Sequence, residues 1–327
     1  MHELESVVAE IGTFTLMACL DMSAWDVLVN DSPQGHVFSK SSYLRSLGRG
    51  FMCYEVKNKN QETVAGVAVI EDSGRMAQSP YLFCPYQGIL FTQKISQLTT
   101  QKRILMEFRI TKFLMEHLLE IYQNFSMSLS PFFRDLRPFI WHNYGSGTVF
   151  EIRQKYTANL SLSGFDLILY LNKIRSVRRQ EYNKSNSIVK DSSDIGLFLN
   201  MYVKTFNRQG LQVDPMTLKI VEDVCLAAMS GGYGHMSCAC VNGRVASMAF
   251  ILFDEYTAYY LFGVNEPDMR KSNASTRLMI ENIQNAVHKG VKNFDFVGVN
   301  SPQRGDYKLS FAPEIFPYHE VHFQNAK

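Results

Sequence analysis

The chain has 327 residues, of which 46% are hydrophobic and 20% are charged. This composition excludes disordered and fibrous proteins, and the length suits two globular domains of roughly 150 residues each. The formal net charge is +2 at pH 7, so no global field directs the protein to nucleic acid or to a membrane. A polyanionic ligand would need a local cluster of basic residues.

Cysteine use and the N-terminal residues point to a compartment. The six cysteines are scattered, with no CxxC pair and no histidine at metal-ligand spacing, which predicts reduced thiols and no structural zinc. The start, MHELESVVAEIG, lacks the basic-then-apolar layout of a signal peptide. No apolar stretch reaches the roughly 20 residues of a membrane helix. We therefore expect a cytoplasmic protein with no membrane span and no metal.

The first half alternates strand and helix patterns. Residues 51–58 and 62–71 alternate polar and apolar side chains, as the two strands of a hairpin do. Apolar residues at helical spacing predict a helix of about six turns over 102–123. A short strand over 125–128 follows, and 131–139 opens another helix.

The second half repeats this order. Its predicted elements are a strand over 156–162, helices over 165–183, 197–208 and 215–229, strands over 235–241, 244–253 and 257–262, and a helix–strand–loop–strand unit over 275–323. Asn242-Gly243 predicts a tight hairpin turn between the first two of the three strands. An internal duplication explains the repeat better than one large sheet. We expect an α/β (α+β) fold with two domains, 1–155 and 156–327, each a mixed, mostly antiparallel sheet flanked by helices.

The most informative segment covers residues 256–311. An aromatic strand, a helix from Ala274 and a second strand, 293–297, follow one another, with polar residues at the strand ends. An α/β fold places its ligand crevice at such strand ends. The sequences NFDFVG at 293–298 and YKLSF at 307–311 resemble the most recognisable stretch of the FemAB-like branch of the GNAT acyltransferases.

The resemblance covers nearly the whole chain and is stronger after Tyr156. In the first half, the region of Trp25 and the segments 38–44 and 85–88 resemble the usual landmarks of the family. FemAB-like proteins consist of two GNAT-type domains in tandem, in agreement with the predicted duplication. The resemblance implies an N-acyltransferase that moves an acyl or aminoacyl group from an activated donor to an amine on a small molecule, a sugar or a peptide.

A basic helix over 173–184 is the first candidate site. On a helix, three- and four-residue spacings place one group of side chains on a single face: Arg175, Arg178, Arg179 and Tyr182. Forked guanidinium groups suit phosphate, and the tyrosine adds a hydroxyl. FemAB-like proteins carry a similar pattern beside the phosphates of the donor or acceptor. The alternative is a solvated basic helix end facing the negative pole of the helix dipole.

The segment 270–275 precedes the helix of the second candidate site. GNAT enzymes that use acyl-CoA carry a glycine-rich loop there, whose backbone amides bind the pyrophosphate at the helix N-terminus. Arg270 is present, but Asn273 and Ser275 stand where the family has glycines. Their side chains crowd the approach of a pyrophosphate, although Asn tolerates the left-handed conformation and Ser caps helices. The alternative is an ordinary capped helix start.

Two residues are candidates for the chemical step. Alternation along the strand places Asp295 opposite Phe294 and Phe296, where it is a candidate general base for the amine or a structural acceptor for loop amides. Lys308 follows the flexible pair Gly305-Asp306 and is expected in a polar loop. The resemblance implies that Lys308 binds phosphate or stabilises the charge that develops on the acyl group; the alternative is a solvated surface lysine. The substrate-binding candidates also include Tyr260 and Phe311.

The resemblance leaves the donor open between acyl-CoA and aminoacyl-tRNA, and no tightly bound cofactor is expected. One alternative function is a Fem-type, aminoacyl-tRNA-dependent transferase that extends a cell-wall precursor. The small net charge argues mildly against binding of the tRNA acceptor arm. Another alternative is a GNAT-like protein that binds its ligand without catalysis. The degenerate loop over 270–275 keeps that alternative open.

Overall fold

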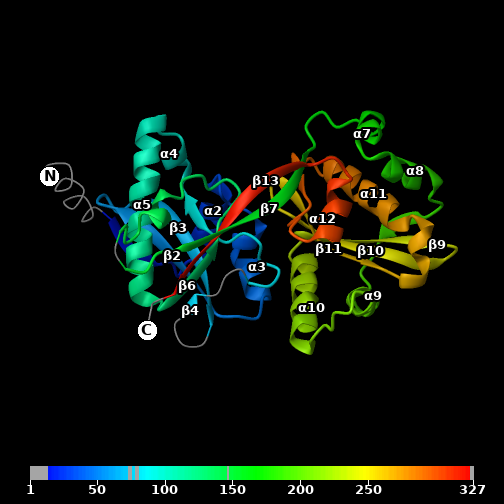
Figure 1. The fold of residues 1–327 in the computed structure, drawn as a ribbon, viewed down its shortest axis with the longest axis horizontal. Helices are drawn as coiled ribbons and strands as arrows, with labels where there is room; N and C mark the ends of the chain where they lie inside the picture. Colours follow the sequence, from blue (N-terminus) through cyan, green and yellow to red (C-terminus); the bar gives the residue numbers. More distant parts are fainter. Residues whose placement is uncertain (1–13, 73–75, 78–80, 146, 325–327) are drawn as a thin grey trace. The chain divides into compact units, whose positions relative to one another are not determined.

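The computed structural model describes residues 14–72, 76–77, 81–145 and 147–324. The chain forms two compact units (Figure 1). Unit 1 comprises Met1–Arg45, Arg49–Lys155 and Pro317–Lys327, and unit 2 comprises Ser46–Gly48 and Tyr156–Phe316. These units differ from the predicted domains 1–155 and 156–327 in two segments, because the last strand returns to unit 1 and a three-residue turn clusters with unit 2.

Unit 1 is built on a hairpin, a long helix and the C-terminal strand. Its strands are β1 (Phe14–Ala18), β2 (Phe51–Asn58), β3 (Thr63–Asp72), β4 (Met76–Ala77), β5 (Ile89–Phe91), β6 (Asn124–Ser128) and most of β13 (Glu314–Gln324). Its helices are α2 (Met22–Asp31), η1 (Val37–Ser39), α3 (Ser41–Ser46), α4 (Gln93–Ser96), α5 (Thr100–Ile121) and α6 (Arg137–Ile140). The predicted hairpin, long helix and short strand are therefore present, whereas the helix expected over 131–139 shrinks to the single turn of α6.

Unit 2 contains all the candidate site residues. Its strands are β7 (Glu151–Ser161, of which the first five residues belong to unit 1), β8 (Ile188–Asp191), β9 (Gly234–Val241), β10 (Arg244–Phe253), β11 (Thr257–Asn265) and β12 (Asn293–Asp295). Its helices are α7 (Leu167–Lys173), α8 (Ser176–Lys184), α9 (Ile195–Asn207), α10 (Pro215–Ser230), η2 (Pro267–Ser272), α11 (Ala274–His288) and α12 (Pro302–Leu309). The β9–β10 hairpin turns at Asn242 and Gly243 with positive φ angles, as the Asn-Gly pair predicts.

The strands of the two units follow the same order. In unit 1 the order is β1-β2-β3-β4-β6-β13, with β5 paired to β3. In unit 2 the order is β8-β9-β10-β11-β12-β7. Among the described residues, β4 pairs with β6 and β11 with β12 in parallel, one such pair in each unit, and a helix lies between the members of each pair in sequence. The predicted mixed, mostly antiparallel sheets flanked by helices are confirmed, and the shared order agrees with a duplication.

Helices cover both faces of the unit 2 strands. The helix α11 contacts β9 and β10, while α10 contacts β9 and α9 contacts β11. Figure 1 shows α8 and α11 on one side of these strands, with α9 and α10 on the other. Three of the unit 2 helices begin at aspartate caps. Asp166, Asp194 and Asp214 each accept a hydrogen bond, at 2.8 Å, from the backbone amide three residues later.

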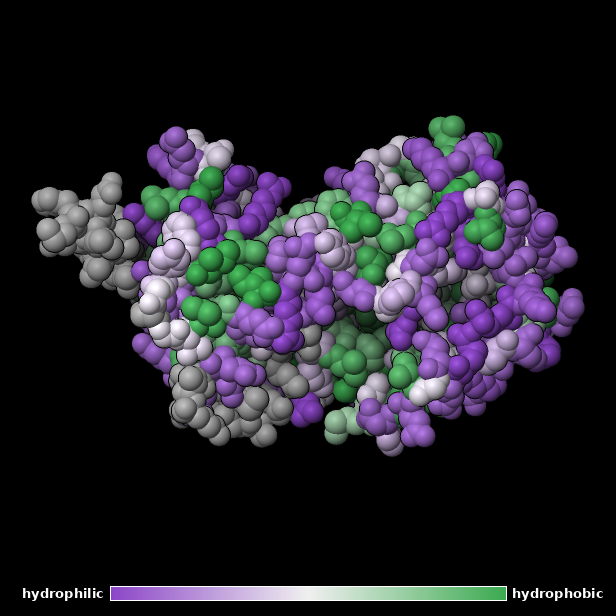
Figure 2. Space-filling model, viewed as in Figure 1, coloured by the Kyte–Doolittle hydropathy of each residue, from purple (hydrophilic) through white to green (hydrophobic). Residues whose placement is uncertain are grey.

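The helix expected over 165–183 is two helices, α7 and α8. The break falls at Ile174 and Arg175, whose ψ angles of 158° and 140° are extended. The backbone amide of Arg175 donates to the carbonyl of Ser310 at 3.0 Å, so a contact with a distant segment accompanies the break. On α7, Ile168 and Leu169 remain 72% and 62% exposed, and Figure 2 shows apolar side chains where this helix lies.

Candidate functional site

The parallel strands β11 and β12 pair over three residues only. The paired residues run from Thr257 with Asn293 to Tyr259 with Asp295. The strand β12 ends at Asp295, whereas β11 continues to Asn265. In open α/β sheets, ligands bind at the carboxyl ends of neighbouring strands. The groups around the end of β12 are therefore the natural candidates for chemistry.

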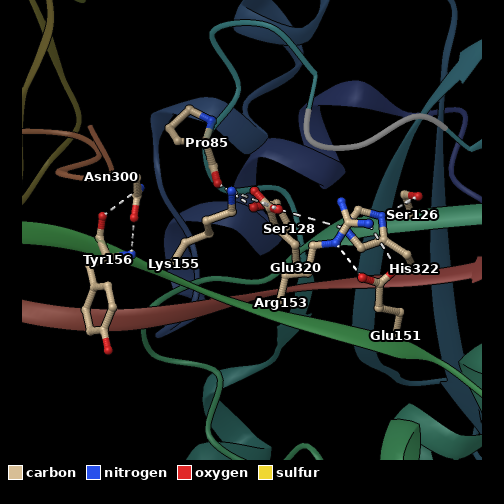
Figure 3. Close-up of polar contacts among 10 residues, drawn as sticks. All are labelled: Pro85, Ser126, Ser128, Glu151, Arg153, Lys155, Tyr156, Asn300, Glu320 and His322. Atoms are coloured by element: carbon tan, nitrogen blue, oxygen red, sulfur yellow. Dashed lines mark hydrogen bonds and ion pairs between the residues drawn. The ribbon is translucent and has the colours of Figure 1, made fainter. Parts of the chain in front are cut away.

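The turn after β12 has an unusual backbone. Val297 and Gly298 both have positive φ angles, 52° and 56°. A β-branched residue in the left-handed region costs about 1–2 kcal/mol, and such strain is concentrated at functional sites. Asn300 anchors the turn to β7, since its side chain accepts from the amide of Tyr156 at 2.7 Å and donates to the carbonyl of Tyr156 at 3.0 Å (Figure 3).

Asp295 is buried, with 4% of its surface exposed. Its Oδ1 accepts hydrogen bonds from the hydroxyl of Thr157 and from the amide of Val297, both at 2.7 Å. Its neighbours in the strand, Phe294 and Phe296, pack in the core on the opposite face. These contacts support a structural role for Asp295, and they fix the direction of its carboxylate.

Lys308 lies on α12, not in the flexible loop that the sequence predicted. Its Nζ donates to the carbonyl of Gly298 at 3.0 Å and to that of Val297, and lies 5.9 Å from the ring centre of Tyr260. Burial lowers the pKa of Lys308 from 10.5 to about 8, although the charge of Asp295 acts in the opposite direction. The ammonium group thus stays mostly charged at neutral pH, although burial disfavours its charged form.

Gly305 allows α12 to pack against the turn. A Cβ atom at this position would lie 2.6 Å from the carbonyl oxygen of Val299, which is closer than van der Waals contact permits. The glycine that suggested a flexible loop is therefore a helical residue at a close approach. The approach brings Lys308, one turn further along, to the end of β12.

Arg178 lies within a network of side chains. Its guanidinium donates to the carboxylate of Glu181, to the hydroxyl of Ser310 at 3.0 Å and to that of Thr276 at 3.3 Å. Its Cζ also lies 5.0 Å from the ring centre of Tyr307. Glu181 in turn accepts from Thr276 at 2.5 Å. The network joins α8 to α11 and α12.

The other residues of the basic helix have separate partners. Arg175 pairs with Asp306 at 2.7 Å, and Arg179 donates to the side chain of Asn172 at 3.2 Å. Tyr182 is 9% exposed and packs in the core, with Arg277 stacked on its ring at 4.5 Å. The four residues expected on one ligand-binding face therefore contact three different helices, α7, α11 and α12.

The start of α11 has the backbone that a phosphate-binding turn needs. Asn273 has a φ angle of 62°, the left-handed conformation that sequence analysis allowed for it. Arg270 is exposed, and its charge, together with burial as the larger cause, lowers the pKa of nearby Arg208. The carbonyl of Ser275 accepts from the hydroxyl of Tyr307 at 3.2 Å. Positive charge thus collects at the N-terminus of α11.

The two aromatic candidates differ in position. Phe311 is fully buried and stacks on Phe296 at 6.0 Å, so it belongs to the core. Tyr260 is half-buried beside Lys308, and burial raises its pKa above the ordinary range. A Cβ atom on Gly263 would lie 1.7 Å from the Tyr260 hydroxyl, so the ring folds back over its own strand at this glycine.

Residues 171–309 match the family model described as the acetyltransferase (GNAT) domain. The matched segment runs from α7 to the end of α12 and contains Asp295 and Lys308. Comparison with curated proteins gives no match.

Solved structures share the fold over nearly the whole chain. FemX aligns with a TM-score of 0.67 at 12% identity, covering 93% of this chain and 96% of its own. A tandem GNAT protein from the clavulanic acid biosynthesis pathway aligns with a TM-score of 0.53 at 11% identity, covering 96% and 99%. L-PGS from Bacillus licheniformis aligns with a TM-score of 0.54 at 12% identity, covering 92% and 91%.

Residues 171–309 thus match a GNAT domain, and the fold of the whole chain is similar to those of FemX and the tandem GNAT protein. GNAT domains generally use acyl-CoA as a co-substrate, and the positive start of α11 with left-handed Asn273 suits a phosphate group. The side chains of Asn273 and Ser275 are the part of this GNAT domain that fits a pyrophosphate poorly. Across the described segments, we find no cluster of three His, Cys, Asp or Glu residues suited to a metal and no helix able to span a membrane.

Unit 1 has a polar cluster of its own, shown in Figure 3. Glu320 on β13 is 5% exposed and lies 3.6 Å from Nζ of Lys155 and 3.8 Å from Nε2 of His322. Nδ1 of His322 lies 2.9 Å from the hydroxyl of Ser126 on β6. Sequence spacing alone suggested no partner for this histidine. The cluster ties together β6, β13 and the first residues of β7.

Several residues of the unit 2 site carried no signal in the sequence. Thr157 and Tyr156 lie on β7, about half the chain away from the turn that they hold. Glu181 interrupts the basic pattern of α8, and the sequence alone gives it no role. In the structure its carboxylate neutralises Arg178. The positive φ of Val297 marks the turn as special in the structure, and no residue propensity predicts such an angle for a β-branched residue.

Proposed function

We propose that the GNAT domain of unit 2 transfers an acyl group from an activated ester or thioester to an amine, with Lys308 as the electrophilic group. The carbonyl carbon of the donor gains a bond to the amine nitrogen and loses its bond to the leaving thiol or hydroxyl. Negative charge develops on the carbonyl oxygen in between, and a positioned cation in a site that excludes water stabilises it.

The observation that carries this proposal is the place of Lys308. Its ammonium group is held by the carbonyls of Val297 and Gly298, at the end of β12 where the neighbouring strand continues. A solvated surface lysine would have neither these contacts nor a pKa near 8. In this proposal, Asp295 orients the turn and takes the proton that the amine loses, and the leaving group then receives that proton.

The geometry supports the start of α11 as the site of the donor phosphates. The backbone amides of its first turn and the exposed Arg270 would bind them, and Asn273 already holds the required left-handed conformation. We place the acyl carbonyl near Lys308. The acceptor is a small molecule, a sugar or a peptide that carries an amine.

A second candidate function is aminoacyl transfer from tRNA. Asn273 and Ser275 replace the two glycines that allow close approach of a pyrophosphate, and this replacement favours a donor without one. An aminoacyl ester of tRNA has that property. The structural likeness to FemX concerns the fold and is compatible with either donor.

A transfer assay tests the proposal. The purified full chain is incubated with acetyl-CoA or with aminoacyl-tRNA, each with a panel of amino sugars, dipeptides and polyamines, and products are detected by mass spectrometry. Product that appears with wild type and falls strongly in Lys308→Met supports the function. Ligand binding without turnover, under conditions where both donors stay intact, would show a protein that binds without catalysis.

A further inference from the structure

Asn159 of β7 carries a polar atom that the fold leaves unused. Its Oδ1 is buried, and within the described residues no group donates a hydrogen bond to it. A buried acceptor without a donor destabilises a protein, so each one in a native structure requires an explanation. Asn159 is paired directly with Asp295 in the antiparallel β7–β12 ladder. The unused acceptor therefore lies next to the proposed reaction site.

The polar neighbours of Asn159 are engaged elsewhere. Thr157, two residues earlier on the same face of β7, donates its hydroxyl to Asp295 at 2.7 Å. Tyr259, the β11 residue paired with Asp295, donates its hydroxyl to Asp254 at 2.6 Å. Both donors that flank the position thus have acceptors of their own. A donor for Asn159 must come from outside these side chains.

Asp295 and Asn159 lie on the same face of the sheet. Phe294 and Phe296 point into the core that includes α11, so Asp295 points to the other face. Asn159, directly across the ladder, shares that face, and cross-strand partners have Cβ atoms about 4.5–5.5 Å apart. A side-chain amide oxygen and a carboxylate thus stand side by side at the end of β12.

We propose that Asn159 binds the acceptor amine, with its Oδ1 accepting a hydrogen bond from an N–H of that amine beside the carboxylate of Asp295. This inference rests on the proposed function and specifies its substrate class. Two neighbouring acceptors, one of them charged, select a group that is cationic when it binds and has at least two N–H donors. This ammonium group releases one proton to solvent before its neutral nitrogen attacks the acyl carbon. A primary amine meets both conditions, whereas a tertiary amine or a lone hydroxyl does not.

The first test needs no substrate and compares two asparagines. Asn282 is 3% exposed on α11, and its side chain is fully engaged: Oδ1 accepts from Ser237 and Nδ2 donates to the carbonyl of Leu278, both at 2.9 Å. We expect Asn282→Leu to lower Tm by a few degrees. Asn159→Leu should leave Tm unchanged or raise it, because leucine removes an unpaired acceptor. A loss of Tm in Asn159→Leu equal to that of Asn282→Leu would overturn the proposal.

The second test uses methylammonium chloride as the probe, with tetramethylammonium chloride at the same concentration as its control. Both ions carry one positive charge, but only methylammonium has N–H donors. We expect methylammonium to give the higher Tm in wild type and in Asn282→Leu, and no difference between the salts in Asn159→Leu. Equal Tm values for wild type in the two salts would contradict the proposal.

Both tests are independent of the acyl donor, so they can fail while the transfer assay succeeds, and the reverse. Once the transfer assay gives a product, Asn159→Leu should raise KM for the amine by roughly tenfold and leave KM for the donor unchanged. An unchanged KM for the amine would remove Asn159 from the acceptor site without affecting the role of Lys308.

Discussion

Nζ of Lys308 lies 3.0 Å from the carbonyl oxygen of Gly298 and donates a hydrogen bond to it. The contact joins α12 to the turn that ends β12, so the charge of the lysine stands where the two parallel strands part. A half-buried ammonium group at this place combines a lowered pKa with a fixed position. Both properties suit a group that stabilises charge on an acyl oxygen.

Replacing Lys308 by methionine should reduce acyl transfer. Methionine keeps the length and apolar stem of the side chain but removes the charge, and loss of one oxyanion donor typically costs about 10²–10³ in rate. The measurement is kcat with the amine and donor found in the transfer assay. Lys59→Met is the matched control, because Lys59 is exposed in the turn between β2 and β3 of unit 1 and should tolerate the change. Similar rates for both variants would exclude an electrophilic role for Lys308.

The pH dependence should show the protonated lysine as the active form. Its pKa of about 8 means that the ammonium group is lost as pH rises through 8. Arginine stays charged throughout, so the ratio of the wild-type rate to the Lys308→Arg rate should fall over this interval. Taking the ratio removes the titration of the amine substrate. A ratio that rises through pH 8 would instead identify Lys308 as a base.

Asp295→Asn should shift this titration to lower pH. The carboxylate of Asp295 raises the pKa of Lys308 against the larger effect of burial, so its removal lowers the pKa further. An asparagine Oδ1 can still accept from Thr157 and Val297, which preserves the turn. The measurement is the pH dependence of the reduced rate that remains after loss of the proposed base, with Tm as a check on the fold. An unchanged midpoint would show that the two charges do not interact.

Arg178→Ala should destabilise the protein by about 1–3 kcal/mol, because it removes charge-assisted hydrogen bonds and leaves Glu181 without its cation. Urea unfolding measures the free energy of unfolding. Arg179→Ala is the control, since Arg179 makes one hydrogen bond to Asn172 and should change stability by less than about 0.5 kcal/mol. Equal stability for both variants, with weaker binding of a phosphate ligand, would restore the phosphate-binding interpretation of Arg178.

Changing Asn273 and Ser275 to glycine should strengthen coenzyme A binding. Asn273 already has a positive φ, so glycine meets no backbone strain there, and both changes remove side chains that obstruct a pyrophosphate. Altered capping at the start of α11 should cost only about 1 kcal/mol of stability. Titration of coenzyme A into wild type and the double variant measures the effect. Tight binding to wild type that the glycines do not improve would show that this loop accepts acyl-CoA as it stands.

Local patterns in the sequence determined most of the elements. Hydrophobic periodicity placed α5, α9, α10 and α11, because each buries a stripe of side chains at helical spacing. Asn242-Gly243 placed a hairpin turn, because both residues accept positive φ. The same kind of reasoning failed at Gly305. This glycine predicted a flexible loop, but it is a helical residue packed against Val299.

The tertiary structure alone decided how the site is assembled. Thr157 and Asn159 come to Asp295 from a strand more than 130 residues earlier, and nothing in either segment encodes that β7 is the neighbour of β12. The pattern of the basic helix predicted a phosphate site, and only the fold shows that Arg178 donates hydrogen bonds to Glu181 and Thr276. Pairings between distant segments depend on packing of the whole unit, whereas periodicity and turn residues report only on a few neighbouring positions. For this reason the sequence identified Asp295 and Lys308 as candidates. Only the fold shows the hydrogen-bond partners that orient their side chains.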